Sequence, residues 1–178
     1  MKGFCAMVGA ALLILGGCQP STPSGPGPNW QEFAPEGRGF SILFPGTPTE
    51  ETTRYPTAFG VVDTAWFKLE PEGQKLSYSV RYDSYPPGVL ALGNVSQLIL
   101  ARSKTFEHEI QGKRIDEQDV FLDDHIGKQL TIELPDGKLG IYRIFLIDER
   151  MYQLGVKAAP EDASAKEIST FLDSFKLL

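Results

Sequence analysis

Five acidic side chains and one histidine lie close together in the second half of the chain. Groups of this kind could bind a cation or transfer protons. The cluster consists of Asp116, Glu117, Asp119, Asp123, Asp124 and His125. Carboxylate oxygens suit hard cations, and calcium takes about six to eight of them at defined positions. The spacing fits no calcium loop, because the glycine and the closing glutamate of such a loop are missing. We interpret the cluster as a solvated strand end and predict no bound metal or other cofactor. The residues that would be the candidate ligands of a metal are Asp119, Asp123, Asp124 and His125.

Sequence signatures of known enzymes are absent elsewhere. His108-Glu109 is not the start of a zinc-protease helix, since Gly112 stands where the second histidine would be. The chain has no Gly-x-Ser-x-Gly elbow and no glycine-rich phosphate loop. We predict a protein that is not an enzyme, with no catalytic residue assigned. A hydrolase that uses the carboxylates of Asp116 to Asp124 with His125 remains the enzymatic alternative.

The remaining reactive side chain is the thiol of Cys18. Lys2 precedes an apolar run that ends in Leu15-Gly16-Gly17-Cys18, the layout of a cleaved secretion signal. The run from Phe4 to Gly17 is shorter than the ~20 apolar residues that span a bilayer as a helix. Leu15-Gly16-Gly17-Cys18 resembles the lipobox of bacterial lipoproteins. That resemblance implies a diacylglyceryl group on the Cys18 sulfur, cleavage before Cys18, and acylation of the new amino group, for example with palmitate.

Lipidation at Cys18 has consequences for the whole chain. Residues 1–17 become a signal peptide, and two or more acyl chains hold a protein at a membrane where one does not. Cys5 leaves with the signal, so the mature domain has no thiol for a disulfide or a thiolate metal site. The net charge changes from −6 to −7 with the loss of Lys2. Nucleic acid is therefore excluded as a partner, because its binding needs clustered Lys and Arg.

Residues 18–29 read as a spacer between the lipid and the domain. Four prolines alternate there with Ser, Thr and Gly, a composition that gives an extended chain of about 3 Å per residue. Pro20, two places after Cys18, is not the aspartate that retains many lipoproteins in the inner membrane. We therefore expect the cell envelope as the location, with the outer membrane favoured where the cell has one.

The elements of residues 30–178 follow from their hydrophobic patterns. Strands are predicted at 40–44, 61–69 and 77–83, then a helix with Leu92, Val95, Leu98, Ile99 and Phe106 on one stripe, whose edge at Arg102 is solvated. Asn94 and Gln97 suggest a capping box at its start. A meander of strands at 114–122, 129–134, 139–147 and 150–158 is followed, after Pro160, by a helix that carries Ile168, Phe171, Leu172 and Phe175. The prediction is a single α+β domain with a largely antiparallel sheet and two main helices.

Three segments carry a further resemblance: residues 39–45, 150–154 and 171–177. Together with the order of the elements they resemble the PsbP-type fold, an α/β/α layered sandwich to which LpqN-like lipoproteins also belong. PsbP itself is an extrinsic protein of photosystem II. The resemblance implies a non-catalytic domain that binds a protein partner or a small molecule, with Phe40, Ile42, Tyr152, Leu154 and Phe175 in its core.

Aromatic residues offer the only other candidate binding surface. Trp66, Tyr78 and Tyr82, with Tyr55 and Tyr85 nearby, could line a groove, since Tyr and Trp combine a large apolar area with a polar tip. The preferred prediction is a lipid-anchored accessory module that binds an envelope protein or a small molecule. The alternatives are a cation-dependent assembly factor, as for photosystem II, and the hydrolase described above.

Overall fold

The computed structural model describes residues 29–57, 60–71, 75–89, 93–163 and 165–178. The predicted signal peptide, the lipobox with Cys18, the spacer up to residue 28, and Leu92 lie outside the described residues. Neither of the described α-helices has the length and apolar character that crossing a bilayer requires.

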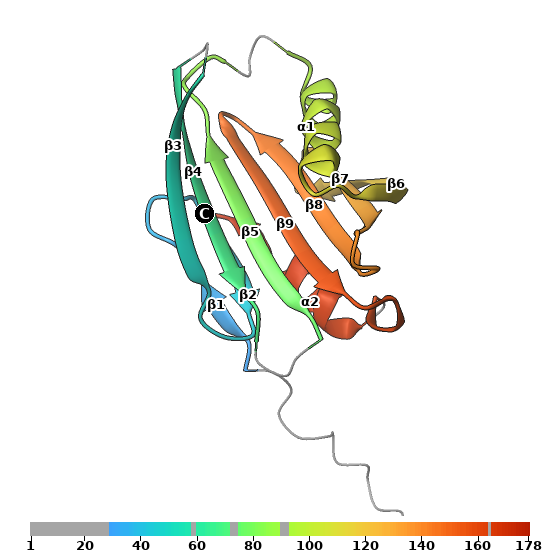
Figure 1. Cartoon of the computed structure of the whole chain (residues 1–178). Coiled ribbons are helices and arrows are strands. Elements are labelled where there is room, and N and C mark those ends of the chain that lie inside the picture. The colour runs from blue at the N-terminus through green and yellow to red at the C-terminus, as the bar shows by residue number, and fades with distance from the viewer. Residues whose placement is uncertain (1–28, 58–59, 72–74, 90–92, 164) are drawn as a thin grey trace, which may run out of the picture.

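A seven-stranded antiparallel sheet forms the centre of the molecule (Figure 1). Its order is β3-β4-β5-β9-β8-β7-β6. The strands are β3 (Thr49–Thr57), β4 (Gly60–Leu69), β5 (Ser77–Ser84), β6 (Lys113–Leu122), β7 (His125–Glu133), β8 (Leu139–Ile147) and β9 (Arg150–Ala158). The three strands in the middle are joined over their whole lengths, with Arg81 opposite Gln153 and Gln153 opposite Ile144. Side chains alternate between the two faces of such a sheet, so each face can be assigned from the register.

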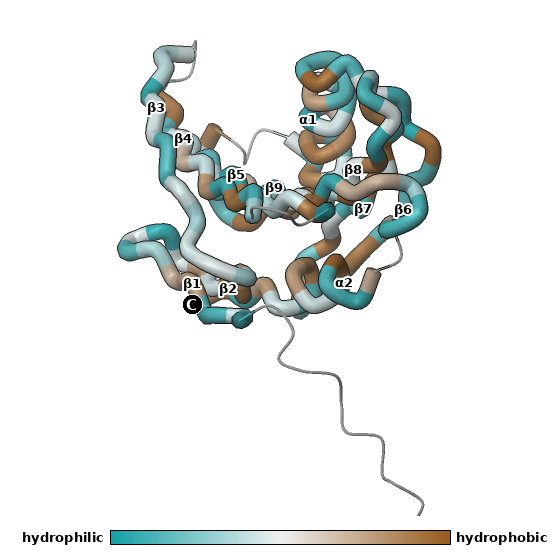
Figure 2. Tube along the Cα trace, turned by 60° about the horizontal axis from the view of Figure 1, so that its bottom comes forward, coloured by the Kyte–Doolittle hydropathy of each residue, from teal (hydrophilic) through white to brown (hydrophobic). Residues whose placement is uncertain are grey.

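One face of this sheet is covered by α1 (Val95–Glu109), which lies over β7 and β8. Ile99 and Phe106 of the helix pack on Leu130, Tyr142 and Ile144. Asn94 is the N-cap of the helix, and its side-chain oxygen accepts the backbone N–H of Gln97 at 3.3 Å. In Figure 2, α1 lies on one side of strands β5 and β9, and strands β3 and β4 lie on the other side.

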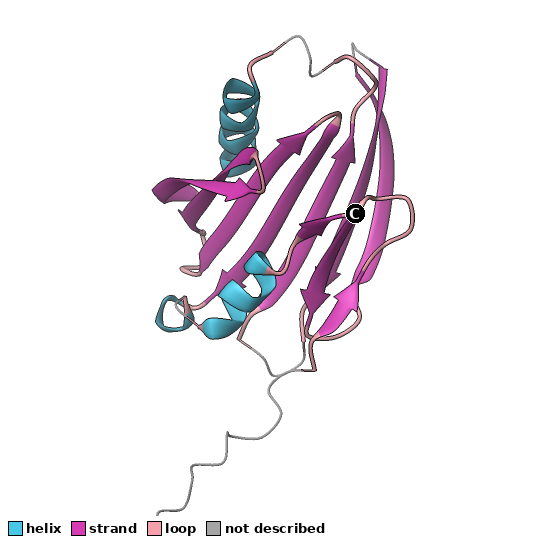
Figure 3. Cartoon of the chain, turned by 180° about the vertical axis from the view of Figure 1, so that it is seen from behind, coloured by secondary structure: helices cyan, strands magenta, loops and turns pink. Residues whose placement is uncertain are grey.

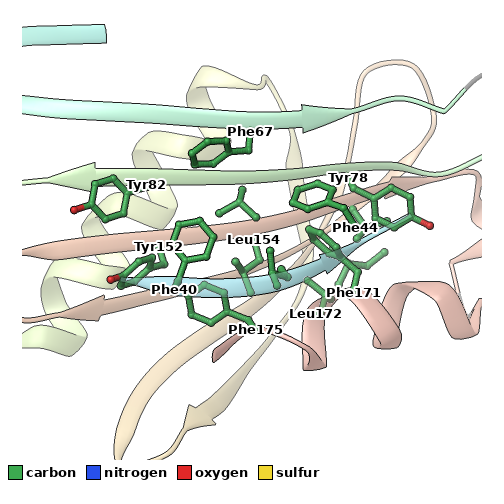
Figure 4. Packing of buried hydrophobic residues seen from close by; sticks show 14 of the residues in the cluster. Phe40, Phe44, Phe67, Tyr78, Tyr82, Tyr152, Leu154, Phe171, Leu172 and Phe175 are labelled. Carbon is green, nitrogen blue, oxygen red and sulfur yellow. The ribbon is translucent and has the colours of Figure 1, made fainter. Parts of the chain in front are cut away.

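The opposite face is covered by a small second sheet and by α2 (Lys166–Asp173), as Figure 3 shows from behind. The small sheet has the order β1-β2-β10, from β1 (Gln31–Phe33), β2 (Phe40–Phe44) and β10 (Lys176–Leu177), and a 3-10 turn, η2 (Pro160–Asp162), precedes α2. The main core lies between these layers and is rich in aromatic rings (Figure 4). Phe40 contacts Phe67, Tyr152 and Phe175 with ring centroids 5.5 to 6.0 Å apart.

The architecture confirms the prediction of a largely antiparallel α+β fold with two helices. Phe40, Ile42, Tyr152, Leu154 and Phe175 are all buried, as expected. The differences are local: β7 begins at His125, α2 ends before Phe175, and the sequence patterns did not predict β1, β3 or β10.

The expectation that Arg102 is solvated was wrong. Only 10% of its side chain is exposed, because the guanidinium lies over the ring of Phe106 at 5.6 Å and its Nη1 pairs with Glu109.

Candidate functional site

The three aromatic candidates do not share one surface. Trp66 is 38% exposed on the α1 side of β4, where the Lys68 ammonium lies 4.3 Å from its ring centroid. Tyr78 and Tyr82 are 1% and 3% exposed and point into the main core on the other side of the sheet (Figure 4). Of the three, only Trp66 is placed to contact a ligand.

The acidic candidates lie on β6 and on the turn to β7. Glu117 and Asp119 both pair with Lys128, at 2.9 and 2.7 Å, and Glu117 also pairs with Arg114. Asp123 occupies the turn with a φ of 50°, and His125 opens the next strand. Within the residues that the structure describes, no three His, Cys, Asp or Glu side chains are grouped as metal ligands.

A different set of polar side chains converges on the α1 side of β4, β5 and β9. We call Thr64, Arg81, Asp83, Arg102 and Gln153 the Arg81 cluster. Arg102, on α1, is included because it interacts electrostatically with Tyr85, as Arg81 and Asp83 also do. Asp83 is its most deeply buried member, at 2% exposure. Its carboxylate accepts the Thr64 hydroxyl at 2.5 Å and the Arg81 Nε–H at 3.0 and 3.1 Å. A buried carboxylate is tolerated because it is paired and hydrogen-bonded in this way.

Two other members of the cluster carry polar atoms that the described residues leave unpaired. Gln153 is 6% exposed, and its Oε1 has no hydrogen-bond partner among them. Arg102 donates from Nη1 to Glu109 at 3.1 Å, but its buried Nη2 has no described partner. Buried polar atoms are nearly always satisfied by protein, water or ligand. These two atoms are therefore an acceptor and a donor that either water or a bound group has to satisfy.

Electrostatic interactions tie the members of this region together. Burial raises the pKa of the Tyr85 phenol to about 12; the charges of Asp83 and Tyr55 add to this, while Arg102 and Arg81 oppose it. Burial disfavours the charged form of Arg81, but Asp83, Tyr55 and Glu109 favour it, so the pKa of its guanidinium is raised. Both tyrosines and Glu109 thus lie within electrostatic range of the cluster.

The strand register fixes which side chains border the cluster. Trp66 stands directly opposite Arg81, which stands opposite Gln153. This row therefore leads from a half-exposed aromatic ring, across a guanidinium, to an unpaired amide oxygen. In Figures 1 and 2, α1 lies beyond β9, over β8 and β7, rather than over β3 and β4. The groups on this row are suited to recognising a polar ligand through hydrogen bonds and aromatic contact.

Sequence reasoning missed the Arg81 cluster because its members read as ordinary surface residues. Arg81 and Asp83 alternate with Tyr82 on β5, a pattern that predicts a solvated face. Gln153 gave the usable signal. It lies in the middle of β9, where the other buried residues are apolar.

Comparisons with known proteins identify a fold. The solution structure of cyanobacterial PsbP (CyanoP) from Synechocystis sp. PCC 6803 is similar, with a TM-score of 0.58 and 15% identity, over 92% of this chain and 99% of that one. The chain has a PsbP-like fold.

Other comparisons add little to this result. A crystal structure of a protein of unknown function from Pseudomonas aeruginosa, PA94, described as a putative regulator, has a TM-score of 0.43 and 14% identity, over 66% of this chain and 90% of that one. That similarity is too low to support an inference. A scan against family models and a search of curated proteins by sequence found no match. The PsbP-like layers place the Arg81 cluster on the face that carries α1, away from the small sheet and α2.

Proposed function

We propose that the protein is a non-catalytic binding module of the bacterial cell envelope, tethered by lipid on Cys18, that binds an envelope protein through the Arg81 cluster and Trp66. The observation that carries this proposal is the pair of unsatisfied buried atoms, Gln153 Oε1 and Arg102 Nη2. A polypeptide segment supplies what each lacks, because every peptide unit has one N–H and one C=O.

The surroundings of the cluster favour a protein partner. Trp and Arg are enriched at the centres of protein interfaces, where they carry much of the binding free energy. Trp66 is exposed and stands beside Arg81, which is itself 20% exposed. The likeness to cyanobacterial PsbP is a likeness of fold, and it is compatible with a binding role without identifying the partner.

Site-specific photo-cross-linking in cells tests the proposal. A photoreactive amino acid replaces Trp66 in the full-length lipoprotein, and the control carries the same amino acid at Phe121, which is 70% exposed on the edge strand β6. We expect a discrete adduct from position 66 and none from position 121. Arg102→Gln, which removes the unpaired Nη2, should reduce the adduct at least several-fold. The melting temperature of this variant is measured to show that it is folded.

Two results would contradict this function. One is an absence of adducts at position 66 in intact cells. The other is an adduct pattern that is the same from both positions and insensitive to Arg102→Gln.

A further inference from the structure

We propose that a second site, a cleft between α2 and the β7–β8 part of the main sheet, binds a small amphipathic carboxylate. The cleft has a volume of about 290 Å³. Ligand pockets usually begin at about 300 Å³, so the space suits a short acyl or aryl acid. The site lies on the face opposite the Arg81 cluster and is independent of the function proposed above.

The walls of the cleft are divided between apolar and polar groups. Ile141, Ile168 and Leu172, with Ala163 and Ala165, supply apolar surface from β8, α2 and the segment before it. Gln129, Thr131, Arg143 and Ser169 supply the polar groups. Ligand sites characteristically combine an apolar lining with a few placed polar groups that fix orientation.

Arg143 is the group that selects a carboxylate. Its Nε donates to the Gln129 side-chain oxygen at 2.8 Å, which fixes the plane of the guanidinium. Its Nη1 pairs with Asp173 at 2.7 Å. Arg143 is 21% exposed and Asp173 is 61% exposed. An exposed ion pair of this kind contributes little, because water competes for both charges.

A carboxylate that enters the cleft can replace Asp173 and improve on it. Guanidinium groups bind carboxylates most strongly through two parallel N–H···O bonds, and Asp173 lies at the exposed end of α2, where its contact with Arg143 joins Nη1 to the carboxylate at 2.7 Å. The ligand's apolar part would then lie against Ile168 and Leu172. Asp173 therefore acts as a competitor for Arg143, and this predicts opposite effects for changes at the two residues.

Calorimetry on the full-length lipoprotein in nanodiscs tests the site, with empty nanodiscs as the blank. The probe is hexanoate, and hexanol and hexylammonium are matched ligands without the negative charge. We expect saturable 1:1 binding of hexanoate only. Arg143→Gln should weaken it at least tenfold, and Asp173→Asn should strengthen it several-fold. Ser169→Trp, at an exposed position of α2 that lines the cleft, should abolish it.

Arg54→Gln is the matched control, because Arg54 also pairs with an aspartate, Asp63, but on the β3–β4 hairpin away from the cleft. It should leave hexanoate binding unchanged. The gain in affinity from Asp173→Asn cannot result from misfolding. The proposal is overturned if hexanoate does not bind saturably, if hexanol binds equally well, or if Asp173→Asn weakens binding.

Discussion

At the scale of single residues, the Arg81–Asp83 pair shows how a buried charge depends on its partner. Asp83 is 2% exposed and Arg81 20%. Removing one partner of such a pair leaves the other charge buried and unpaired, which costs roughly 3–5 kcal/mol. We expect Arg81→Leu to lower the free energy of unfolding by about 3 kcal/mol in urea titrations. Arg81→Leu with Asp83→Leu should lose less than Arg81→Leu alone.

The control for this prediction is the exposed pair of Arg54 and Asp63. Arg54→Leu should change the urea midpoint little, because both charges remain in water when separated. A double variant at Arg81 and Asp83 that is less stable than the single variant would contradict the argument.

The buried tyrosines make a second prediction, on alkaline stability. Burial raises the pKa of Tyr78, Tyr85 and Tyr142 to about 12, above the ordinary value near 10. A pKa raised by folding stabilises the protonated state, so this contribution is complete below about pH 10 and is lost between about pH 10 and 12. Absorbance at 295 nm should show these phenols ionising late, together with the loss of near-ultraviolet circular dichroism.

Tyr85→Phe supplies the check on that alkaline prediction. It removes one late-titrating phenol and should flatten the loss of stability between pH 10 and 12. Ionisation of all six tyrosines near pH 10, with the fold intact, would show that the phenols are not protected.

At the scale of the elements, the stability of α1 depends on the residue that caps its N-terminus. Asn94 accepts the Gln97 N–H, and replacing such a cap by alanine costs about 1 kcal/mol. We expect Asn94→Ala to lower the free energy of unfolding by about that amount. Thr105→Ala, at an exposed position of the same helix, is the control and should change stability much less. An equal loss from both variants would show that the cap does not matter.

The elements differ in how well their sequences predict them. β5 was recognisable because Tyr78 and Val80 alternate with polar residues. β8 was recognisable because it is apolar on both faces. β3 was not, because nearly all of its residues are exposed and Pro56 is typical of an edge strand rather than of a central one. An edge strand with two solvated faces has no hydrophobic period to detect.

The candidate sites were harder to predict than the strands. Arg81 and Gln153 come from β5 and β9 and meet only through the register of the sheet, while the packing of α1 brings Arg102 within electrostatic range of Tyr85. Arg102 illustrates the limit, because its position on the helix predicts solvent while Phe106 and Glu109 enclose it. Arg143 and α2 likewise meet only through the layering of the fold.

At the scale of the whole molecule, the main sheet separates the Arg81 cluster from the start of the described chain. The Arg81 cluster lies on the α1 face, whereas the described chain begins on the face that carries the small sheet, α2 and the α2 cleft, where Trp30 packs edge-on against Tyr78 at 5.8 Å. A tether that joins the domain near Trp30 therefore need not cross the Arg81 cluster. This arrangement suits the proposed module, which would be held at a membrane and bind its partner through the α1 face.

The anchor itself provides the last prediction. Replacing Cys18 by serine removes the sulfur that would carry the diacylglyceryl group, so the protein should no longer incorporate labelled palmitate or sediment with membranes. Cys5→Ser is the matched control, because Cys5 is the only other cysteine and lies in the predicted signal. It should be labelled and should sediment like the original protein, since two or more acyl chains hold a protein at the bilayer. Membrane sedimentation of the Cys18→Ser protein, or an unlabelled original protein, would remove the lipid anchor from the proposed function while leaving both binding sites open to their own tests.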